Sequence, residues 1–262
     1  MIVLIKGAGD LATGVAHRLK RCGLDIVMTE ISEPTTVRRT VAFSQAVYDN
    51  TAEVEGIKAI HVSKIEEINK VIKEGNIPVI VDEKAKIIKD LNPDVVVDAI
   101  IAKENLGTRI NDAPIVIALG PGFTAGFDCH CVVETQRGHY LGKAIYTGSA
   151  IPNTGVPGDI GGYTSERIIR AISDGKIFPV SKIGDYVEKG DIVAYVEGIP
   201  IFAKIGGIVR GMLQNNVNVF KGMKSGDIDP RCEKNHCFTI SDKARSIGGG
   251  VLEAILYLKS ML

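Results

Sequence analysis

Hydrophobic and polar residues follow one another along the first half of the chain in blocks that predict strands followed by helices. Residues 2–6 are apolar up to Lys6, which is typical of a strand buried on both faces. Residues 11–21 place apolar side chains at helical spacing and cationic side chains opposite them. Residues 26–28 repeat the buried-strand pattern, and this strand ends at Glu30. The chain therefore opens with a predicted strand–helix–strand unit.

The same pattern continues to residue 119. It predicts further strands at residues 57–62, 78–82, 95–98 and 115–119, and helices at residues 34–46, 64–74 and 83–91. Strands that alternate with helices indicate a parallel sheet with right-handed crossovers. We expect a doubly wound, Rossmann-type α/β domain over residues 1–175.

The pattern changes near residue 176. Residues 177–228 contain short apolar stretches separated by Gly-Asp and Gly-Gly pairs, and helical spacing is absent. Such closely spaced turn signals indicate a small all-β unit, which we place at residues 176–230. Residues 247–260 return to helical spacing. We expect a C-terminal segment, residues 231–262, whose helix packs back on the first domain.

Composition and charge exclude some classes of function. Lys plus Arg and Asp plus Glu number 31 each, so no general attraction to nucleic acid or to an anionic membrane is expected. No apolar run approaches the roughly 20 residues of a membrane span. The first residues lack the charged leader and apolar length of a signal peptide. We expect a cytoplasmic protein that binds neither nucleic acid nor membrane.

The strand–helix turn near the N-terminus resembles a dinucleotide-binding fingerprint. Gly7-x-Gly9-x-x-Ala12 follows a buried strand and opens a helix, and Glu30 ends the next strand. In such a turn the first glycine allows the tight bend, and the second lets the backbone approach a pyrophosphate. The small third residue allows close packing, and the acidic residue accepts hydrogen bonds from a ribose. Asp10, directly after the second glycine, completes this candidate cofactor-binding set.

A second set of candidate cofactor-binding residues follows later strands. Asp98 ends one predicted strand, and Gly120 and Gly122 follow the strand at 115–119. Ligands of open α/β sheets bind at the carboxyl ends of strands. The glycine- and proline-rich segment 148–162 is either a further wall of such a site or a flexible connector.

The densest group of reactive side chains comprises Cys129, His130, Cys131 and Glu134. A strand over residues 129–135 would place both cysteines on one face and the histidine and glutamate on the other. The thiols are then either core residues, carriers of a sulfur or selenium atom, or ligands of a soft metal. The thiolate character of the two cysteines would decide among these roles. All four residues are candidate catalytic residues.

The other cysteines do not indicate a disulfide framework or a metal site. The chain has five cysteines, an odd number for a framework of pairs. Cys232 and Cys237 form a C-x4-C spacing, and Cys129 and Cys131 form C-x-C. Neither spacing is usual for a structural zinc site, so no metal is expected.

Residues 180–222 resemble a lipoyl/biotinyl-type barrel. The resemblance rests on Gly184-Asp-Tyr-Val-Glu-Lys-Gly190-Asp, Pro200-Ile-Phe-Ala-Lys-Ile-Gly-Gly207 and Val217-Asn-Val-Phe-Lys-Gly222. Carrier domains of this type present a modified lysine at the tip of the central hairpin. The corresponding tip here, residues 197–200, has no lysine, so a structural or docking module is expected rather than a swinging arm.

Several motifs together resemble one family across essentially the whole chain. They are Gly7-Ala-Gly-Asp-Leu-Ala-Thr-Gly14, Pro34-Thr-Thr-Val-Arg-Arg-Thr-Val-Ala-Phe43, Arg137-Gly-His-Tyr-Leu-Gly142, Gly226-Asp-Ile-Asp-Pro-Arg231 and Ile240-Ser-Asp-Lys. The chain looks like the YqeB-type accessory proteins of selenium-dependent molybdenum hydroxylases. It is also similar in kind to xanthine dehydrogenase accessory proteins, which carry a Rossmann-type domain.

The resemblance implies a maturation factor that handles the molybdenum cofactor or its selenium ligand, with the hydroxylase apoprotein as partner. The bound dinucleotide would be NAD(P) or the molybdopterin dinucleotide, since a pyrophosphate is common to both. One alternative is an NAD(P)-dependent oxidoreductase that uses His130 or His139 as proton donor. Another is a non-enzymatic scaffold that docks the hydroxylase through residues 177–228. Whether the chain is an enzyme is left open by these alternatives.

Overall fold

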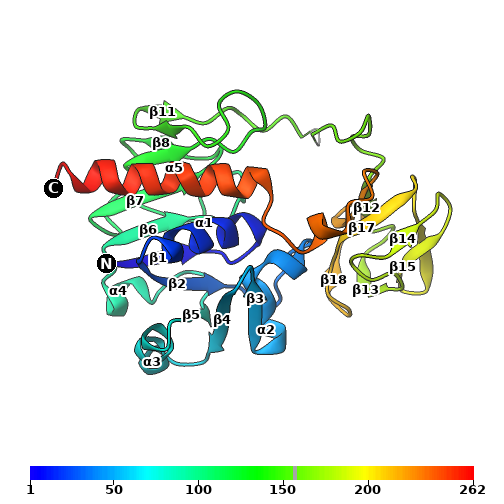
Figure 1. The fold of residues 1–262 in the computed structure, drawn as a ribbon, viewed down its shortest axis with the longest axis horizontal. Helices are drawn as coiled ribbons and strands as arrows, with labels where there is room; N and C mark the ends of the chain where they lie inside the picture. Colours follow the sequence, from blue (N-terminus) through cyan, green and yellow to red (C-terminus); the bar gives the residue numbers. More distant parts are fainter. Residues whose placement is uncertain (156–157) are drawn as a thin grey trace. The chain divides into compact units, whose positions relative to one another are not determined.

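The computed structural model of the chain describes residues 1–155 and 158–262. Pro157, in the glycine- and proline-rich segment, lies outside these residues. The chain forms two compact units (Figure 1). The first comprises Met1–Pro34, Ala42–Thr154 and Ile240–Leu262, and the second comprises Thr35–Val41 and Gly155–Thr239. Within the described ranges, no helix has both the length and the apolar character needed to cross a membrane.

A nine-stranded sheet forms the centre of the first unit, in the order β10-β9-β7-β6-β1-β2-β5-β4-β3. Its strands are β1 (Ile2–Lys6), β2 (Asp25–Glu30), β3 (Thr51–Val54), β4 (Ile57–Val62), β5 (Ile77–Val81), β6 (Val95–Asp98), β7 (Ile115–Leu119), β9 (Cys131–Val133) and β10 (Ala144–Ile145). The pairs β3–β4 and β9–β10 at the edges are antiparallel, and the other described pairs are parallel. The expected α/β class with a mainly parallel sheet is confirmed.

Short elements and helices complete the first unit. A two-stranded sheet joins β8 (Thr124–Ala125) to β11 (Gly148–Ser149). The helices are α1 (Asp10–Arg21), α2 (Ala46–Asp49), α3 (Ile68–Lys73), α4 (Ile88–Leu91) and α5 (Asp242–Lys259), with 3-10 turns at Phe43–Gln45 and Ile65–Glu67.

The strand order reverses between β1 and β6. The chain builds outward from β1 through β2 on one side, and from β6 through β7 and β9 on the other. Lys6 and Asp98, the last residues of β1 and β6, lie side by side across this reversal. In open α/β sheets, ligands bind beyond the carboxyl ends of the strands at such a point. The fold therefore places the glycine turn after Lys6 where a ligand site is expected.

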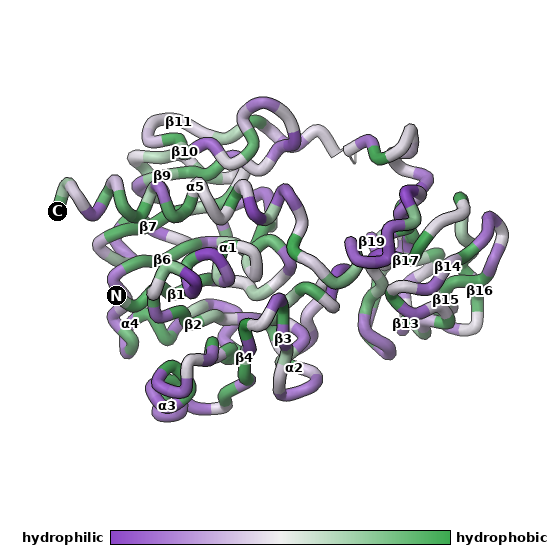
Figure 2. Tube along the Cα trace, viewed as in Figure 1, coloured by the Kyte–Doolittle hydropathy of each residue, from purple (hydrophilic) through white to green (hydrophobic). Residues whose placement is uncertain are grey.

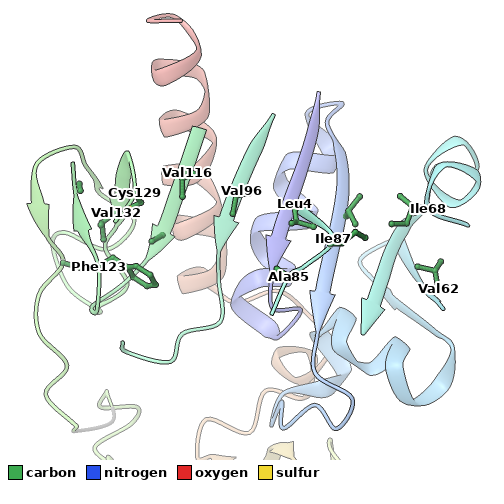
Figure 3. Close-up of a cluster of buried hydrophobic side chains, with 14 of the residues drawn as sticks. Leu4, Val62, Ile68, Ala85, Ile87, Val96, Val116, Phe123, Cys129 and Val132 are labelled. Atoms are coloured by element: carbon green, nitrogen blue, oxygen red, sulfur yellow. The ribbon is translucent and has the colours of Figure 1, made fainter. Parts of the chain in front are cut away.

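Both faces of the sheet are covered by helical segments. On one face, Leu4, Val96 and Val116 pack in a buried cluster with Ile68 of α3 and with Ile87 (Figure 3). Helices α1 and α5 run side by side along the other face (Figure 1). The hydrophobic colour follows β6 and β7, whereas α3 alternates between hydrophobic and hydrophilic residues (Figure 2). This is the pattern of buried strands under amphipathic helices.

Small residues allow α1 and α5 to pack closely. A Cβ on Gly14 would lie 2.6 Å from the Cβ of Ala244, and one on Gly248 would lie 3.0 Å from the Gly14 carbonyl oxygen. Helix α5 begins five residues before the predicted start at 247, at Asp242. The Ser241 side chain accepts a hydrogen bond from the Ala244 N–H and so caps this earlier start.

Two predicted helices are much shorter than expected. The segment 34–46 is not one helix, because Thr35–Val41 belongs to the second unit, where the Val37 carbonyl accepts a bond from Met212 N. Of the predicted helix 83–91, only the last turn, α4, is α-helical. Ala85 has a φ of +48°, which interrupts a helix before this point.

The second unit is built from two four-stranded antiparallel sheets, in the orders β12-β19-β17-β14 and β16-β15-β13-β18. Its strands are β12 (Ile168–Arg170), β13 (Gly175–Pro179), β14 (Tyr186–Val187), β15 (Ile192–Val196), β16 (Ile199–Phe202), β17 (Gly207–Met212), β18 (Asn218–Val219) and β19 (Lys224–Asp229). Two 3-10 turns, Arg39–Val41 and Lys234–Cys237, belong to the same unit. The expected small antiparallel β unit and C-terminal helix are confirmed.

The hairpin between β15 and β16 turns at Glu197 and Gly198. Their φ angles are +48° and +79°, the pattern of the tight turns that suit two-residue hairpins. The Glu197 side chain folds back and accepts a hydrogen bond from Lys176 N. This tip carries no lysine, as the sequence predicted.

Candidate functional site

The turn between β1 and α1 has the geometry that the glycine spacing predicted. Gly7 has a φ of +90°, and a Cβ there would lie 3.1 Å from the Ala99 carbonyl oxygen. Gly9 is the N-cap of α1 and provides no capping side chain. Ala12 is buried in the first turn of the helix. The turn therefore presents the uncapped N-terminus of α1, which is the feature that binds anions in such folds.

A network that the sequence did not reveal holds this turn in place. The Thr13 hydroxyl donates to the Ala8 carbonyl and accepts a bond from Phe43 N at 2.8 Å. Ser44 N also donates to the Ala8 carbonyl, at 2.8 Å. Asp10 lies in the first turn of α1. The helix dipole stabilises its negative charge there, but that charge would repel an incoming anion.

Glu30 lies across the turn from Ala8. Its two carboxylate oxygens accept bonds from Ala8 N and Ile31 N, each at 2.9 Å. Burial raises the pKa of Glu30, although both backbone bonds oppose this shift. Each carboxylate oxygen has more than one lone pair, so a ribose hydroxyl could still donate to Glu30. The expected ribose-binding residue thus also braces the glycine turn.

The Asp98 carboxylate takes part in a buried ion pair. It lies 3.4 Å from the Lys6 ammonium, and the Thr108 hydroxyl joins them by accepting from Lys6 and donating to Asp98, each at 2.5 Å. All three residues are buried. The prediction placed Asp98 among the cofactor-binding residues, and the structure directs its carboxylate to Lys6 and Thr108 instead. A lysine that ends a buried strand was the available sequence signal for this pair.

Gly120 and Gly122 follow β7, and both have positive φ angles. A Cβ on Gly120 would lie 2.5 Å from the Thr135 hydroxyl oxygen, and one on Gly122 would lie 2.6 Å from Glu104 N. Close packing against neighbouring loops therefore accounts for both glycines without a ligand.

Cys129 and Cys131 have the environment of core residues. Neither is exposed, and burial raises the pKa of each thiol to about 12. Cys129 packs in the cluster of Figure 3 together with Val132. Val132 alternates with Cys131 along β9, so the two thiols point to opposite faces rather than sharing one. At neutral pH both are thiols and not nucleophilic thiolates.

His130 and Glu134 lie at opposite ends of β9. His130 precedes β9 at the amino ends of the parallel strands, and its Nδ1 accepts a bond from Val116 N at 3.0 Å. Burial lowers the pKa of His130. Glu134 follows β9 at the carboxyl ends and is buried, with backbone bonds from Thr135, Gln136 and Ile151. The predicted catalytic group is therefore not one cluster.

The turn after β1 and the ends of β2, β6, β7 and β9 lie along the same edge of the sheet, the edge formed by the carboxyl ends of the parallel strands. Register places Gly7, Glu30, Asp98, Gly120 and Glu134 at this edge. Among the residues described, no three His, Cys, Asp or Glu side chains are grouped as metal ligands would be.

Comparison with known proteins found no matching family model. Two solved structures cover 87% of this chain: an aspartoacylase family protein of Mesorhizobium loti (12% identity, 83% of that chain, TM-score 0.25) and a succinylglutamate desuccinylase/aspartoacylase of Rhodobacter sphaeroides (11% identity, 85% of that chain, TM-score 0.27). TM-scores this low carry no argument about fold or function.

One curated relative is much more similar. The chain is 51% identical over 257 residues to YqeB of Escherichia coli (strain K12), which is described as an uncharacterized protein. The match covers 98% of this chain and 48% of that protein, so the chain spans about half the length of its relative. The chain is therefore a close homologue of part of YqeB.

Proposed function

We propose that the first unit binds the pyrophosphate of a dinucleotide at the β1–α1 turn. The observation that carries this proposal is the bond from Ala8 N to Glu30 across a turn whose helix has no capping side chain. The same turn follows β1 at the reversal of strand order. Gly7 allows the tight bend, Gly9 lets the backbone approach phosphate oxygens, and Glu30 offers acceptors to a ribose. The ligand is NAD(P) or the molybdopterin dinucleotide.

We propose further that the chain is a cytoplasmic maturation factor for a selenium-dependent molybdenum hydroxylase, with the apoprotein as its partner. The sequence motifs that resemble the YqeB-type accessory proteins support this role. Selenium or sulfur transfer through Cys129 and Cys131 has little support, because both thiols are buried and have raised pKa values. These cysteines instead stabilise the core around β9.

The alternative of an oxidoreductase has less support. Its candidate proton donor His130 lies at the amino edge of the sheet, opposite the glycine turn. The other candidate, His139, is exposed and packs edge-on against Tyr140. The alternative of a non-enzymatic scaffold depends on docking through the second unit. The hairpin tip of that unit has no lysine that could carry a covalently attached group.

Thermal unfolding of the full chain with NAD, NADH, NADP, NADPH, FAD and CTP tests the ligand proposal. A ligand at 100 times its Kd contributes about 2.7 kcal/mol, which is roughly 5–10 °C in Tm for a chain of this size. Glu30→Gln should reduce the shift, because the amide offers the ribose one acceptor fewer. The matched control Glu53→Gln changes an exposed carboxylate of β3 and should keep the full shift.

Gly9→Val gives the second arm, because its side chain would occupy the approach to the helix N-terminus. A shift that survives Gly9→Val unchanged would place the ligand elsewhere and overturn the proposal. If none of the six compounds raises Tm, the purified chain is analysed for bound pterin, which tests whether the ligand is the molybdopterin dinucleotide. Finding neither a shift nor a pterin would refute dinucleotide binding.

A further inference from the structure

The connection between β6 and β7 is long and irregular. In residues 99–114, which form this connection, the structure describes neither a helix nor a strand. Neighbouring parallel strands are usually joined by a crossover helix, and irregular loops longer than about 12–15 residues are uncommon in compact domains unless they have a function. This connection leaves the sheet at its carboxyl edge, beside the reversal of strand order. We call its first part, residues 99–108, the strap.

The strap lies against two glycine turns, one on each side of β6. A Cβ on Gly7 would lie 3.2 Å from the Ile100 Cα, and a Cβ on Gly122 would lie 2.6 Å from Glu104 N. Gly7 follows β1 and Gly122 follows β7, and these two strands flank β6 in the sheet. The strap therefore crosses the carboxyl end of β6, which is where ligands of open α/β sheets bind.

Asp98 holds the strap at both ends. Its Oδ1 accepts a hydrogen bond from Ile100 N at 3.2 Å, and its Oδ2 accepts one from the Thr108 hydroxyl at 2.5 Å. The Lys6 ammonium donates to the same hydroxyl and pairs with Asp98. Because both bonds of the strap need one orientation of the carboxylate, the loss of either bond weakens the other.

The middle of the strap is weakly held. Lys103 and Glu104 are exposed, and within the described residues their side chains form no hydrogen bond or ion pair. The Asn105 amide ties this part to the neighbouring loop by donating to the Asp128 carboxylate at 3.1 Å. A segment with exposed side chains and few contacts opens at a lower free-energy cost than the strands beneath it.

Two residues of the strap have a left-handed backbone. The φ angles are +62° at Ile101 and +69° at Lys103. Such angles are unfavourable for residues other than glycine, and most of all for a β-branched side chain such as that of Ile101. The conformation in which the strap lies on the glycine turns is therefore strained, and a strap lifted from the turns is free of this constraint.

We propose that the strap is a lid that lifts from the glycine turns as one unit and closes over a ligand bound at the carboxyl edge of the sheet. Opening releases Ile100 N and the Thr108 hydroxyl from Asp98 together, and the strained residues favour it. The identity of the ligand rests on the dinucleotide proposal, whereas the opening of the strap does not. A closed lid excludes water from a bound ligand and slows its release.

Amide hydrogen exchange of the full chain, followed by NMR, tests whether the strap opens as one unit. The Ile100 N–H reports on opening, because its bond to Asp98 breaks when the strap lifts. Thr108→Val removes the hydroxyl at the other end and should speed exchange at Ile100 about tenfold, without changing exchange in β6 and β7. Unchanged exchange at Ile100 would show that the two ends do not open together and would overturn the proposal.

Two glycine substitutions in the middle of the strap form a matched pair, which decides the outcome if Thr108→Val does not fold. Lys103→Gly removes left-handed strain from the closed strap and should slow exchange at Ile100 about threefold. Ala102→Gly changes an exposed neighbour that is not left-handed, and should speed exchange because glycine adds backbone freedom to the open strap. Equal effects of the two substitutions would overturn a lid whose closed state is strained.

NAD as the added ligand separates failure of the lid from failure of the dinucleotide proposal. NAD that raises Tm should also slow exchange at Ile100, roughly tenfold at ten times its Kd, if it binds only under the closed strap. NAD that raises Tm but leaves this exchange unchanged would support binding and overturn the lid. If neither NAD nor the other five compounds raises Tm, the dinucleotide proposal fails, and the variants of the free chain alone support or overturn the opening of the strap.

Discussion

The Lys6 ammonium lies 3.4 Å from the Asp98 carboxylate at the reversal of strand order, and both side chains are at most 5% exposed. This pair joins the ends of β1 and β6 directly below the glycine turn. Breaking a buried ion pair by removing one charge leaves the other uncompensated, which typically costs about 3–5 kcal/mol. We therefore expect Asp98→Asn to lower the free energy of unfolding by about that amount in urea denaturation.

The double variant Lys6→Met with Asp98→Asn serves as the control. It removes both charges and should recover much of the lost stability, because no isolated charge stays buried. A cost below about 1 kcal/mol for Asp98→Asn, in the range of exposed pairs, would show that the pair does not organise the strand ends.

Two neighbouring glycines of α5 provide a second test. A Cβ on Gly250 would collide with the Gly142 carbonyl oxygen, whereas a Cβ on Gly249 would meet no atom within 4 Å. Gly250→Ala should therefore destabilise the first unit by about 1–3 kcal/mol. Gly249→Ala should stabilise it by about 0.5–1 kcal/mol, because alanine loses less backbone entropy in a helix. Tm values of the pair check this, and equal effects would contradict the close packing.

The strands of the first unit could be predicted because their signal is local. Residues 2–6, 95–98 and 115–119 are mainly apolar runs, and burial on both faces of a parallel sheet leaves that pattern in any short window. Residues 57–62 instead alternate in part, because Lys58 of β4 is exposed. The glycine turn was predictable for the same reason. The relation between its amide groups and Glu30 follows once β1 and β2 are paired.

Features set by distant partners were not predictable. The helical pattern of 34–46 is overridden because Arg38 and Arg39 donate to carbonyl groups of Thr239 and Met212. The predicted strand 129–135 shortens to three residues, and this separates the faces of Cys129 and Cys131. The bond from Met212 N to the Val37 carbonyl likewise forms only when β17 meets the segment 35–41.

The cysteines differ in accessibility, which thiol labelling can measure. Cys22 and Cys232 are exposed, whereas Cys129, Cys131 and Cys237 are buried. A thiol reagent at pH 8 should modify two cysteines of the native chain rapidly, and all five after denaturation in urea. In each of the single variants Cys22→Ser and Cys232→Ser, the number of rapidly labelled cysteines should fall from two to one. Rapid native labelling of Cys129 or Cys131 would contradict their burial and would restore them as candidates for sulfur or selenium transfer.

Glu55 gives the first unit a predictable dependence on pH. Its carboxylate accepts bonds from Ile240 N at 2.8 Å and from Arg245 at 2.6 Å, next to the start of α5. Burial alone would raise the pKa of Glu55, but these two bonds outweigh it, and the pKa is lowered. A lowered folded pKa stabilises the native state above the unfolded value near 4.3, and this stability is lost as pH falls through the folded pKa.

We expect Glu55→Gln to lower the free energy of unfolding at pH 7 by about 1–2 kcal/mol, since Arg245 is half exposed and solvent screens the pair. The difference from the unmodified chain should narrow below about pH 4, where Glu55 becomes protonated. Glu53→Gln, which alters an exposed carboxylate of β3, should have no comparable effect at either pH. Urea unfolding between pH 3 and 8 measures both variants, and a constant difference across that range would show that the Glu55 charge does not stabilise the start of α5.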